Sequence, residues 1–289
     1  MKRTMNHMLA SVDQGADELL VSNPWRDLRR FTDARIGLGR AGVSIPTQEL
    51  LAFQLAHAKA QDAVHTPLNI GQLIKDLSAI KSDCAQPPLS LRSRAESRSV
   101  YLQRPDYGRL LHPDSEQVLL DYRNTTSQSY DLVVVLADGL SALAIQENAT
   151  PFLQLLLPQL ARGPIPWRIG PVCIVEQGRV AVGDPVGEIL RAKCVMLLVG
   201  ERPGLSSPDS MGLYLTWSPK AGLTDAYRNC ISNIREAGLS YEEANRKALY
   251  LLNEARRQGL SGVQLKDRTE DLVLTSDEVR GNFLVSTKG

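Results

Sequence analysis

The sequence is poor in cysteine, and the few cysteines that it has are far apart. The 289 residues include four cysteines and no C-x-x-C pair: Cys84, Cys173, Cys194 and Cys230. This spacing excludes a zinc ribbon, a redox-active dithiol and a disulfide framework. It suits the reducing cytoplasm, which is where we expect the chain to reside.

The sequence also lacks an excess of charge and any long apolar run. Its 33 basic and 32 acidic side chains leave a net charge of +1, which gives no reason to expect nucleic acid or an anionic membrane as a partner. The most apolar runs, LVVVLA and CVMLLVG, have the length of a strand and not of a membrane-spanning helix. The N-terminal segment contains no apolar stretch long enough for a signal peptide.

Histidine is missing from the larger, C-terminal part of the chain. The four histidines are His7, His57, His65 and His112, so the residues after 112 cannot supply a histidine base. The sequence also has no nucleophile elbow, no Walker loop and no histidine–glutamate set with metal-ligand spacing. These absences favour a binding domain over an autonomous enzyme.

A glycine-rich segment, RIGLGRAG, has the G-x-G-x-x-G spacing of a dinucleotide-binding loop at Gly37, Gly39 and Gly42. Such a loop requires a hydrophobic strand before it and a helix that opens from it. The preceding segment, SNPWRDLRRFTDA, is charged and instead predicts a helix that Asn23 caps. Gly37 falls where a helix commonly ends in a left-handed conformation. We therefore interpret the glycines as a connector between two helices.

Composition divides the chain into four parts. In chain order, these are a flexible lead-in (1–22), a helical region that ends in a linker (23–99), a Rossmann-like α/β domain (100–264) and a polar tail (265–289). In the helical region, PTQELLAFQLAHAKAQDAV places Leu51, Leu55 and Ala58 at the spacing of a half-buried helix. The linker is predicted from the Pro, Ser and Arg content of residues 82–99.

The predicted α/β domain alternates between strand-like and helical patterns. YDLVVVLA, KCVMLLVG and GLYLTWS predict strands, VCIVEQGRVAV predicts a hairpin that turns at Gln177 and Gly178, and DPVGEILRA predicts a short helix. TDAYRNCISNIREAG and SYEEANRKALYLLNEARRQG predict two further helices, the second capped by Ser240 and ended by Gly259. Continuous apolar strands are buried on both faces. They predict a three-layer fold with a mainly parallel sheet between helices.

Two loops after predicted strands carry candidate ligand-binding residues, because ligands of open α/β sheets bind beyond the carboxyl ends of the strands. The candidates in ADGLS and VGERPGL are Asp138, Gly139, Ser141, Gly200, Glu201, Arg202 and Gly204. Asp138 could equally cap the following helix, and Glu201 with Arg202 could equally form a solvated pair. Cys230 lies on a predicted helix with no base near it in sequence, and we interpret it as a buried structural cysteine.

Five segments, in this order, carry a resemblance to a known family: RIGLGRAG, YLQRPDYGRLL, VVVLADGLSALAI, GEILRAKCVMLLVGERPGL and NCISNI. From about Asn23 to about Gly262, the chain resembles the light (small) subunit of ethanolamine ammonia-lyase. The resemblance implies an adenosylcobalamin-dependent enzyme that converts ethanolamine to acetaldehyde and ammonia by radical chemistry. It also implies a large-subunit TIM barrel that holds the substrate, and heterodimers that assemble into a larger hetero-oligomer.

The resemblance also implies that cobalamin contacts the light subunit at the interface with the large subunit. The family's cofactor contacts correspond to Val180 in GRVAV, Glu201 in VGERPGL and Cys230 in RNCISNI. The family binds the cofactor with its own dimethylbenzimidazole on cobalt, so no protein histidine is needed.

The two ends of the chain depart from the family pattern. Several relatives carry a longer N-terminal extension linked to packaging in a bacterial microcompartment, whereas residues 1–22 alone precede the shared region here. We therefore expect a cytoplasmic protein and leave packaging in a microcompartment open. The segment RTEDLVLTSDEVRGNFLVSTKG lies outside the resemblance.

Two other functions stay open on the sequence. A stand-alone Rossmann-like oxidoreductase would use GLGRAG or ADGLS to bind NAD, and would need an acidic residue at the end of the second strand for the ribose. A structural assembly subunit would make no cofactor contact. It differs from the light-subunit hypothesis only in whether cobalamin touches residues 180–230.

Overall fold

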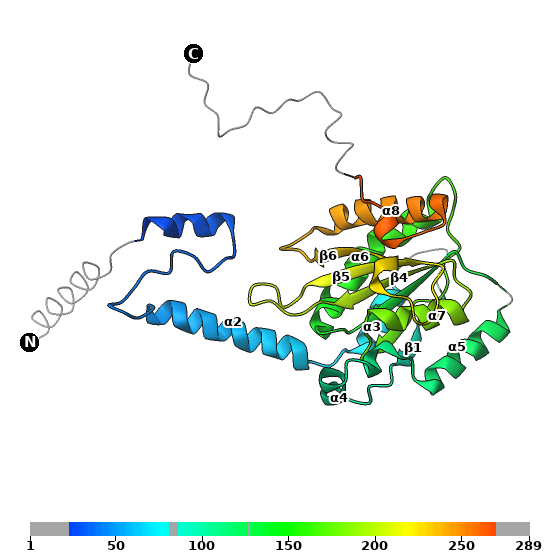
Figure 1. Cartoon of the computed structure of the whole chain (residues 1–289), viewed down its shortest axis with the longest axis horizontal. Helices are drawn as coiled ribbons and strands as arrows, with labels where there is room; N and C mark the ends of the chain where they lie inside the picture. The colour runs from blue at the N-terminus through cyan, green and yellow to red at the C-terminus, as the bar shows by residue number, and fades with distance from the viewer. Residues whose placement is uncertain (1–22, 81–85, 127, 270–289) are drawn as a thin grey trace, which may run out of the picture. The chain divides into compact units, whose positions relative to one another are not determined.

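The computed structural model describes residues 23–80, 86–126 and 128–269. The predicted lead-in, most of the predicted tail and Cys84 lie outside these residues. The described part of the chain forms two compact units, whose elements are labelled in Figure 1. The N-terminal unit comprises residues 23–62 with the loop 204–207, and the α/β unit comprises the other described residues.

The N-terminal unit contains a short helix, a turn with three glycines and most of a longer helix. The short helix, η1 (Pro24–Phe31), is a 3-10 helix whose cap is the predicted one, because the Asn23 side chain accepts a hydrogen bond from the Trp25 N–H. The glycines of RIGLGRAG have positive φ, and α2 (Thr47–His65) begins only after Pro46. Among the described residues no strand precedes these glycines, so the geometry of a dinucleotide-binding loop is absent.

Helix α2 confirms the predicted helix, but the prediction that its apolar face is half-buried is wrong. Leu51 and Leu55 expose 58% and 57% of their surface, and Ala58 is exposed as well. Ala56 is the one buried residue of the N-terminal unit. None of the described helices is both long enough and apolar enough to cross a membrane. The described chain therefore leaves most of this apolar helix uncovered.

The α/β unit is built on a mixed sheet with the strand order β1-β3-β2-β4-β5-β6. The strands are β1 (Leu89–Arg92), β2 (Leu132–Ala137), β3 (Cys173–Glu176), β4 (Cys194–Gly200), β5 (Met211–Trp217) and β6 (Arg228–Ile234). The pairs from β1 to β4 are parallel, whereas β4–β5 and β5–β6 are antiparallel. The prediction of a mainly parallel sheet is therefore correct up to β4 and wrong beyond it.

The antiparallel edge follows from the lengths of the connections after β4. A parallel crossover needs about a dozen residues or more, usually including a helix. Residues 201–210 join β4 to β5, and residues 218–227 join β5 to β6. Neither segment contains an α-helix, so the chain reverses direction after each of these strands.

Helices cover the two faces of the sheet unequally. The helices of the α/β unit are α3 (Ile70–Ser78), α4 (Arg98–Gln103), α5 (Pro113–Thr125), α6 (Ala142–Arg162), α7 (Gly183–Ile189) and α8 (Tyr241–Gln258). Helices α6 and α8 pack on one face as far as β5 and β6. On the other face α5 packs on β1, and α7 packs on β2 and β4 (Figure 1). The predicted layers of helices on both sides are thus present.

Several shorter elements join these parts. The 3-10 helices of the α/β unit are η2 (Tyr107–Arg109), η3 (Val180–Val182), η4 (Asp225–Tyr227) and η5 (Gly262–Gln264). The predicted hairpin at Gln177 and Gly178 is wrong, because β3 pairs in parallel with β1 and β2 and continues into η3. The predicted linker also contains an element, since β1 forms an edge of the sheet.

The segment around Cys230, predicted as a helix, is strand β6. Its apolar residues Ile231 and Ile234 are three positions apart, which is a helical spacing. In the sheet they lie opposite Leu213 and Met211, which are only two positions apart. An extra residue in β6 makes this β-bulge, and Asn233 there has a φ of 61°. The bulge lets both isoleucines enter the core from a strand.

The ends of the two long helices follow the sequence. Helix α8 is capped at its N-terminus by Ser240, whose hydroxyl accepts from the Glu243 N–H, and at its C-terminus by Gly259 with a φ of 69°. Ser141 caps α6 by accepting from the Ala144 N–H at 3.2 Å. Asp138 is therefore not the helix cap.

Close backbone packing after β2 and β4 explains the glycines in both loops. A Cβ on Gly200 would lie 1.9 Å from the Ser141 carbonyl oxygen, and a Cβ on Gly139 would lie 2.2 Å from that of Gly200. The Leu140 N–H donates to this Gly200 carbonyl at 2.9 Å. The two loops thus contact each other through their backbones.

We predict that Gly200→Ala lowers the free energy of unfolding by at least about 2 kcal/mol, because the loop after β2 must move to admit the methyl group. Chemical denaturation of the full chain measures the change. Gly71→Ala is the control, since a Cβ there meets no atom closer than 3.8 Å, and it should leave stability unchanged or raise it by about 0.5 kcal/mol. Equal effects of the two substitutions would contradict this packing.

Candidate functional site

The two predicted ligand loops and the loop after β3 lie at one edge of the sheet, because β2, β3 and β4 run parallel and end there. Asp138 and Gly139 follow β2, Gln177 and Gly178 follow β3, and Glu201 follows β4. The loops after β2 and β3 lead to helices on opposite faces of the sheet, α6 and α7. Such a divergence between neighbouring strands is where open α/β sheets bind ligands.

Asp138 is a buried carboxylate between these two diverging loops. It is 2% exposed and accepts a hydrogen bond from the Gly178 N–H at 3.1 Å. Burial raises its pKa to about 6, although the guanidinium of Arg98 at 3.7 Å favours the charged form. The carboxylate therefore holds the loop after β3 and does not face solvent.

Arg98 fills the space between the loops, and sequence reasoning missed it because it lies at the end of the predicted linker. Its guanidinium donates to the carbonyl oxygens of Val64 at 2.6 Å and Gly139 at 2.7 Å. It also stacks on the Tyr101 ring, 4.8 Å from the ring centroid. The crevice where a dinucleotide would enter is thus occupied by a side chain of this chain.

Glu201 lies at the start of the loop after β4, with its carboxylate above β5. Its Oε2 accepts from the Asn233 N–H at 3.1 Å and from the Ser210 hydroxyl. No described residue donates a hydrogen bond to Oε1 in the structure. A Cβ on Gly212 would lie 2.9 Å from that oxygen, so glycine at this position makes room for the carboxylate. Glu201 therefore retains an acceptor for a ligand.

Cys230 lies on β6 directly opposite Tyr214 of β5, and the prediction that it is buried in a helix is wrong. Its thiol is exposed and lies 3.3 Å from the Ser232 hydroxyl. Burial is the main cause of the raised pKa of Tyr214, and the neighbouring Cys230 and Glu201 raise it further. We call this surface, which Gly212, Tyr214 and Cys230 share, the open face of β5 and β6.

The other predicted residues divide between the two units. Val180 begins η3, is half-buried and packs against the same core cluster as Tyr214. Arg202 is exposed beside Glu201, and Gly204 belongs to the N-terminal unit. Among the described residues no cluster of His, Cys, Asp and Glu could hold a metal ion.

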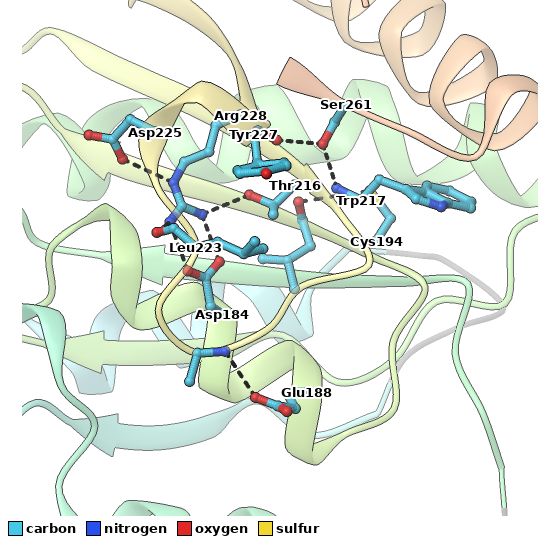
Figure 2. Close-up of polar contacts among 12 residues, drawn as sticks. Asp184, Glu188, Cys194, Thr216, Trp217, Leu223, Asp225, Tyr227, Arg228 and Ser261 are labelled. Atoms are coloured by element: carbon cyan, nitrogen blue, oxygen red, sulfur yellow. Dashed lines mark hydrogen bonds and ion pairs between the residues drawn. The ribbon is translucent and has the colours of Figure 1, made fainter. Parts of the chain in front are cut away.

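A buried ion pair connects the helix that follows Val180 to the strand that carries Cys230. The Arg228 guanidinium of β6 contacts both carboxylate oxygens of Asp184, on α7, at 2.6 and 2.7 Å (Figure 2). Arg228 also donates a hydrogen bond to the Thr216 hydroxyl of β5 at 3.0 Å, so the contact spans three elements. Both charged side chains are nearly inaccessible to solvent.

The remaining donors of Arg228 hold the loop between β5 and β6. Its Nη2 donates to the Leu223 carbonyl at 3.1 Å, and its Nε contacts the exposed Asp225 at 3.1 Å (Figure 2). Sequence reasoning missed Asp184 and Arg228, since no spacing joins two polar residues 44 positions apart. We infer that this network fixes the edge strands relative to α7.

Comparison with known proteins gives a consistent result across the described chain. A family described as "Ethanolamine ammonia-lyase light chain (EutC)" matches residues 22–266. A protein of Pseudomonas fluorescens strain Pf-5 is 54% identical over 91% of this chain and 95% of its own length. One of Pseudomonas aeruginosa strain PAO1 is 52% identical over 95% and 98%, and one of Azotobacter vinelandii is 53% identical over 91% and 96%. Each of the three is described as "Ethanolamine ammonia-lyase small subunit".

We predict that Arg228→Met lowers the free energy of unfolding by about 3–5 kcal/mol, because it leaves the Asp184 carboxylate buried without its partner. Asp184→Leu should also destabilise the fold, but the double variant should lose less than the sum of the two single variants. Urea denaturation of the four proteins measures this coupling. Asp225→Ala serves as a control with an effect below about 1 kcal/mol, because Asp225 is 84% exposed. Additive losses would show that the pair is not a unit.

Proposed function

We propose that the α/β unit of this chain binds adenosylcobalamin at the open face of β5 and β6, since the chain belongs to the ethanolamine ammonia-lyase light-chain family. The chain is a small subunit of that lyase. Together with a large subunit it would convert ethanolamine to acetaldehyde and ammonia. The cofactor, when bound, supplies the radical that starts this reaction, and the protein supplies binding, orientation and exclusion of water.

The observation that carries the proposal is the open face itself. Most of the sheet lies beneath helices on both sides, but here Cys230 and Ser232 of β6 are exposed and Tyr214 is half-buried. A corrin ring is broad and flat and has amide groups around its edge. An exposed strand face with a carboxylate, a hydroxyl and a thiol offers such a ring an area of contact and polar groups for its amides.

Three residues would hold the cofactor, each with a different chemistry. Glu201 would accept a hydrogen bond from a corrin amide or a ribose hydroxyl at Oε1. Val180 would offer backbone groups and apolar surface to the corrin side chains, while Cys230 would pack against the nucleotide tail and not act as a nucleophile. The Arg228–Asp184 ion pair supports this assignment, since it connects α7, which follows Val180 in the chain, to β6, which carries Cys230.

The partner follows from the same assignment. A cofactor on an open face is exposed to water unless a second protein surface covers it. We propose that the large subunit provides this cover, that its TIM barrel holds the substrate, and that the resulting heterodimers assemble into a larger hetero-oligomer. The Rossmann-like, cobalamin-binding type of the fold is part of the same proposal and is supported by the parallel strands up to β4.

The oxidoreductase alternative loses its support in the structure. The glycines of RIGLGRAG follow a 3-10 helix and a loop, and Arg98 occupies the crevice between the loops after β2 and β3. A structural subunit without cofactor contact would leave Glu201 Oε1 to water. A measurement of cofactor binding distinguishes that alternative from the proposal.

The proposal is tested by co-expressing the chain with its cognate large subunit and measuring acetaldehyde formation from ethanolamine. We expect activity that requires both chains and added adenosylcobalamin. A complex whose large subunit turns over equally well without this chain would favour a structural role. Failure to form any complex would overturn the proposal.

We predict that Glu201→Ala weakens cobalamin binding to the reconstituted complex by about 1–3 kcal/mol, because a buried polar group of the cofactor loses its acceptor. A titration followed by calorimetry or by the cobalamin absorption spectrum measures the affinity. Arg202→Ala is the matched control, since this exposed neighbour has no assigned contact. Unchanged affinity in Glu201→Ala would remove Glu201 from the site.

A further inference from the structure

The N-terminal unit has almost no core of its own. Ten of the fifteen exposed large hydrophobic side chains in the described part of the chain belong to residues 23–62. They are Trp25, Leu28, Phe31, Ile36, Val43, Ile45, Leu50, Leu51, Phe53 and Leu55. Ala56 is the one buried residue in the same range. A unit of this size without a core needs a second surface to be stable.

Helix α2 carries few charges for an exposed helix. Between residues 47 and 62 it carries Glu49, Lys59 and Asp62 as its charged residues, while apolar side chains recur on several sides. Exposed apolar side chains in this number mark a surface that another molecule covers. Helix α2 has 19 residues, and none of the described helices is both long and apolar enough to cross a membrane. The description of the relatives as a small subunit supplies a second protein chain that would cover α2.

Polar contacts hold the N-terminal unit in shape while its apolar side chains point outward. The Arg29 guanidinium contacts both carboxylate oxygens of Glu49 at 2.8 and 2.7 Å, which ties η1 to α2. Arg35 donates to the Leu205 carbonyl and the Ser206 hydroxyl at 3.2 Å, which holds the loop 204–207 in the same unit. The apolar surface is thus prearranged for binding, which lowers the entropic cost of docking.

The same unit contains a hollow and a mild excess of positive charge. The hollow has a volume of about 420 Å³ and lies between η1 and α2, with Leu38, Ile45 and Phe53 in its lining. It is large enough to admit a bulky side chain of a partner. Residues 23–62 carry six Arg or Lys and four Asp or Glu. A complementary surface would present apolar side chains bordered by carboxylates.

From these observations we infer that the exposed apolar surface of η1 and α2 is a docking surface for the large subunit. The inference rests on the proposed function, because the small-subunit name of the relatives is what supplies a second protein chain. It adds a contact made by the N-terminal unit to the one proposed for the α/β unit. The partner surface would be apolar with acidic residues at its border.

The test replaces Leu51 and Leu55, two exposed leucines one turn apart on α2, with aspartate in the full chain. The large subunit is held at fixed concentration, the small subunit is titrated, and cofactor-dependent acetaldehyde formation and complex mass are both recorded. We expect the half-saturating concentration to rise at least ten-fold, since charges would be buried against an apolar partner. The activity at saturation should stay within two-fold of wild type, because the cofactor site is unchanged.

A matched control adds two charges at exposed aliphatic residues of the α/β unit, Val118→Asp with Val263→Asp, and should shift half-saturation by less than three-fold. Phe31→Asp is a second docking variant on η1, and we expect it to leave the fold intact because the side chain is 75% exposed. Hydrogen exchange in α2 should slow when wild-type chain joins the large subunit.

Three outcomes would overturn the inference. One is a half-saturating concentration that equals the wild-type value in both docking variants. Another is a rise in the control variant as large as that in the docking variants. The third is a change in the mass or melting temperature of the variant chain alone, which would show that a second copy or the α/β unit covers the surface. If wild-type chain itself forms no complex, the proposed function fails; if wild type binds and the variants bind equally well, only the docking surface is wrong.

Discussion

The two short connections after β4 are the constraint on which the candidate site depends. Because neither contains a crossover helix, β5 and β6 turn back antiparallel and extend the sheet beyond β4, where the main strand contacts of α7 lie. Helix α8 then returns to the other face, where it completes the core with α6. The remaining face bears Tyr214 and Cys230, and it stays accessible because of this chain topology.

An edge without a covering helix needs another means of support, and the Arg228–Asp184 ion pair provides it. Desolvating two charges is costly, and a buried pair of this kind adds little net stability compared with apolar packing. Its benefit is geometric: the bidentate contact, with Thr216 between the strands, permits one arrangement of α7 and β6. Two of the residues proposed to contact the cofactor, Val180 and Cys230, lie within four positions of these two anchors in the chain.

The two units are held together by different kinds of interaction. The α/β unit buries its apolar residues internally, as the fully buried strands β2 and β4 show. The N-terminal unit uses polar contacts such as Arg29–Glu49 for its internal order and leaves Trp25 and Phe31 outside. Such a division is expected of a chain that folds around one core and completes its second part in an assembly.

The sequence by itself determined the elements whose signals are local. The apolar runs of β2 and β4, the Ser240 and Gly259 ends of α8 and the loop position of Glu201 all depend on neighbouring residues, so they could be predicted. Only the tertiary structure decided that the bulge at Asn233 makes the segment of Cys230 a strand, and that Arg98 occupies the crevice beside Asp138. It also decided the pairing of Arg228 with Asp184. These features join residues far apart in the chain, and their energies come from burial, which no local pattern records.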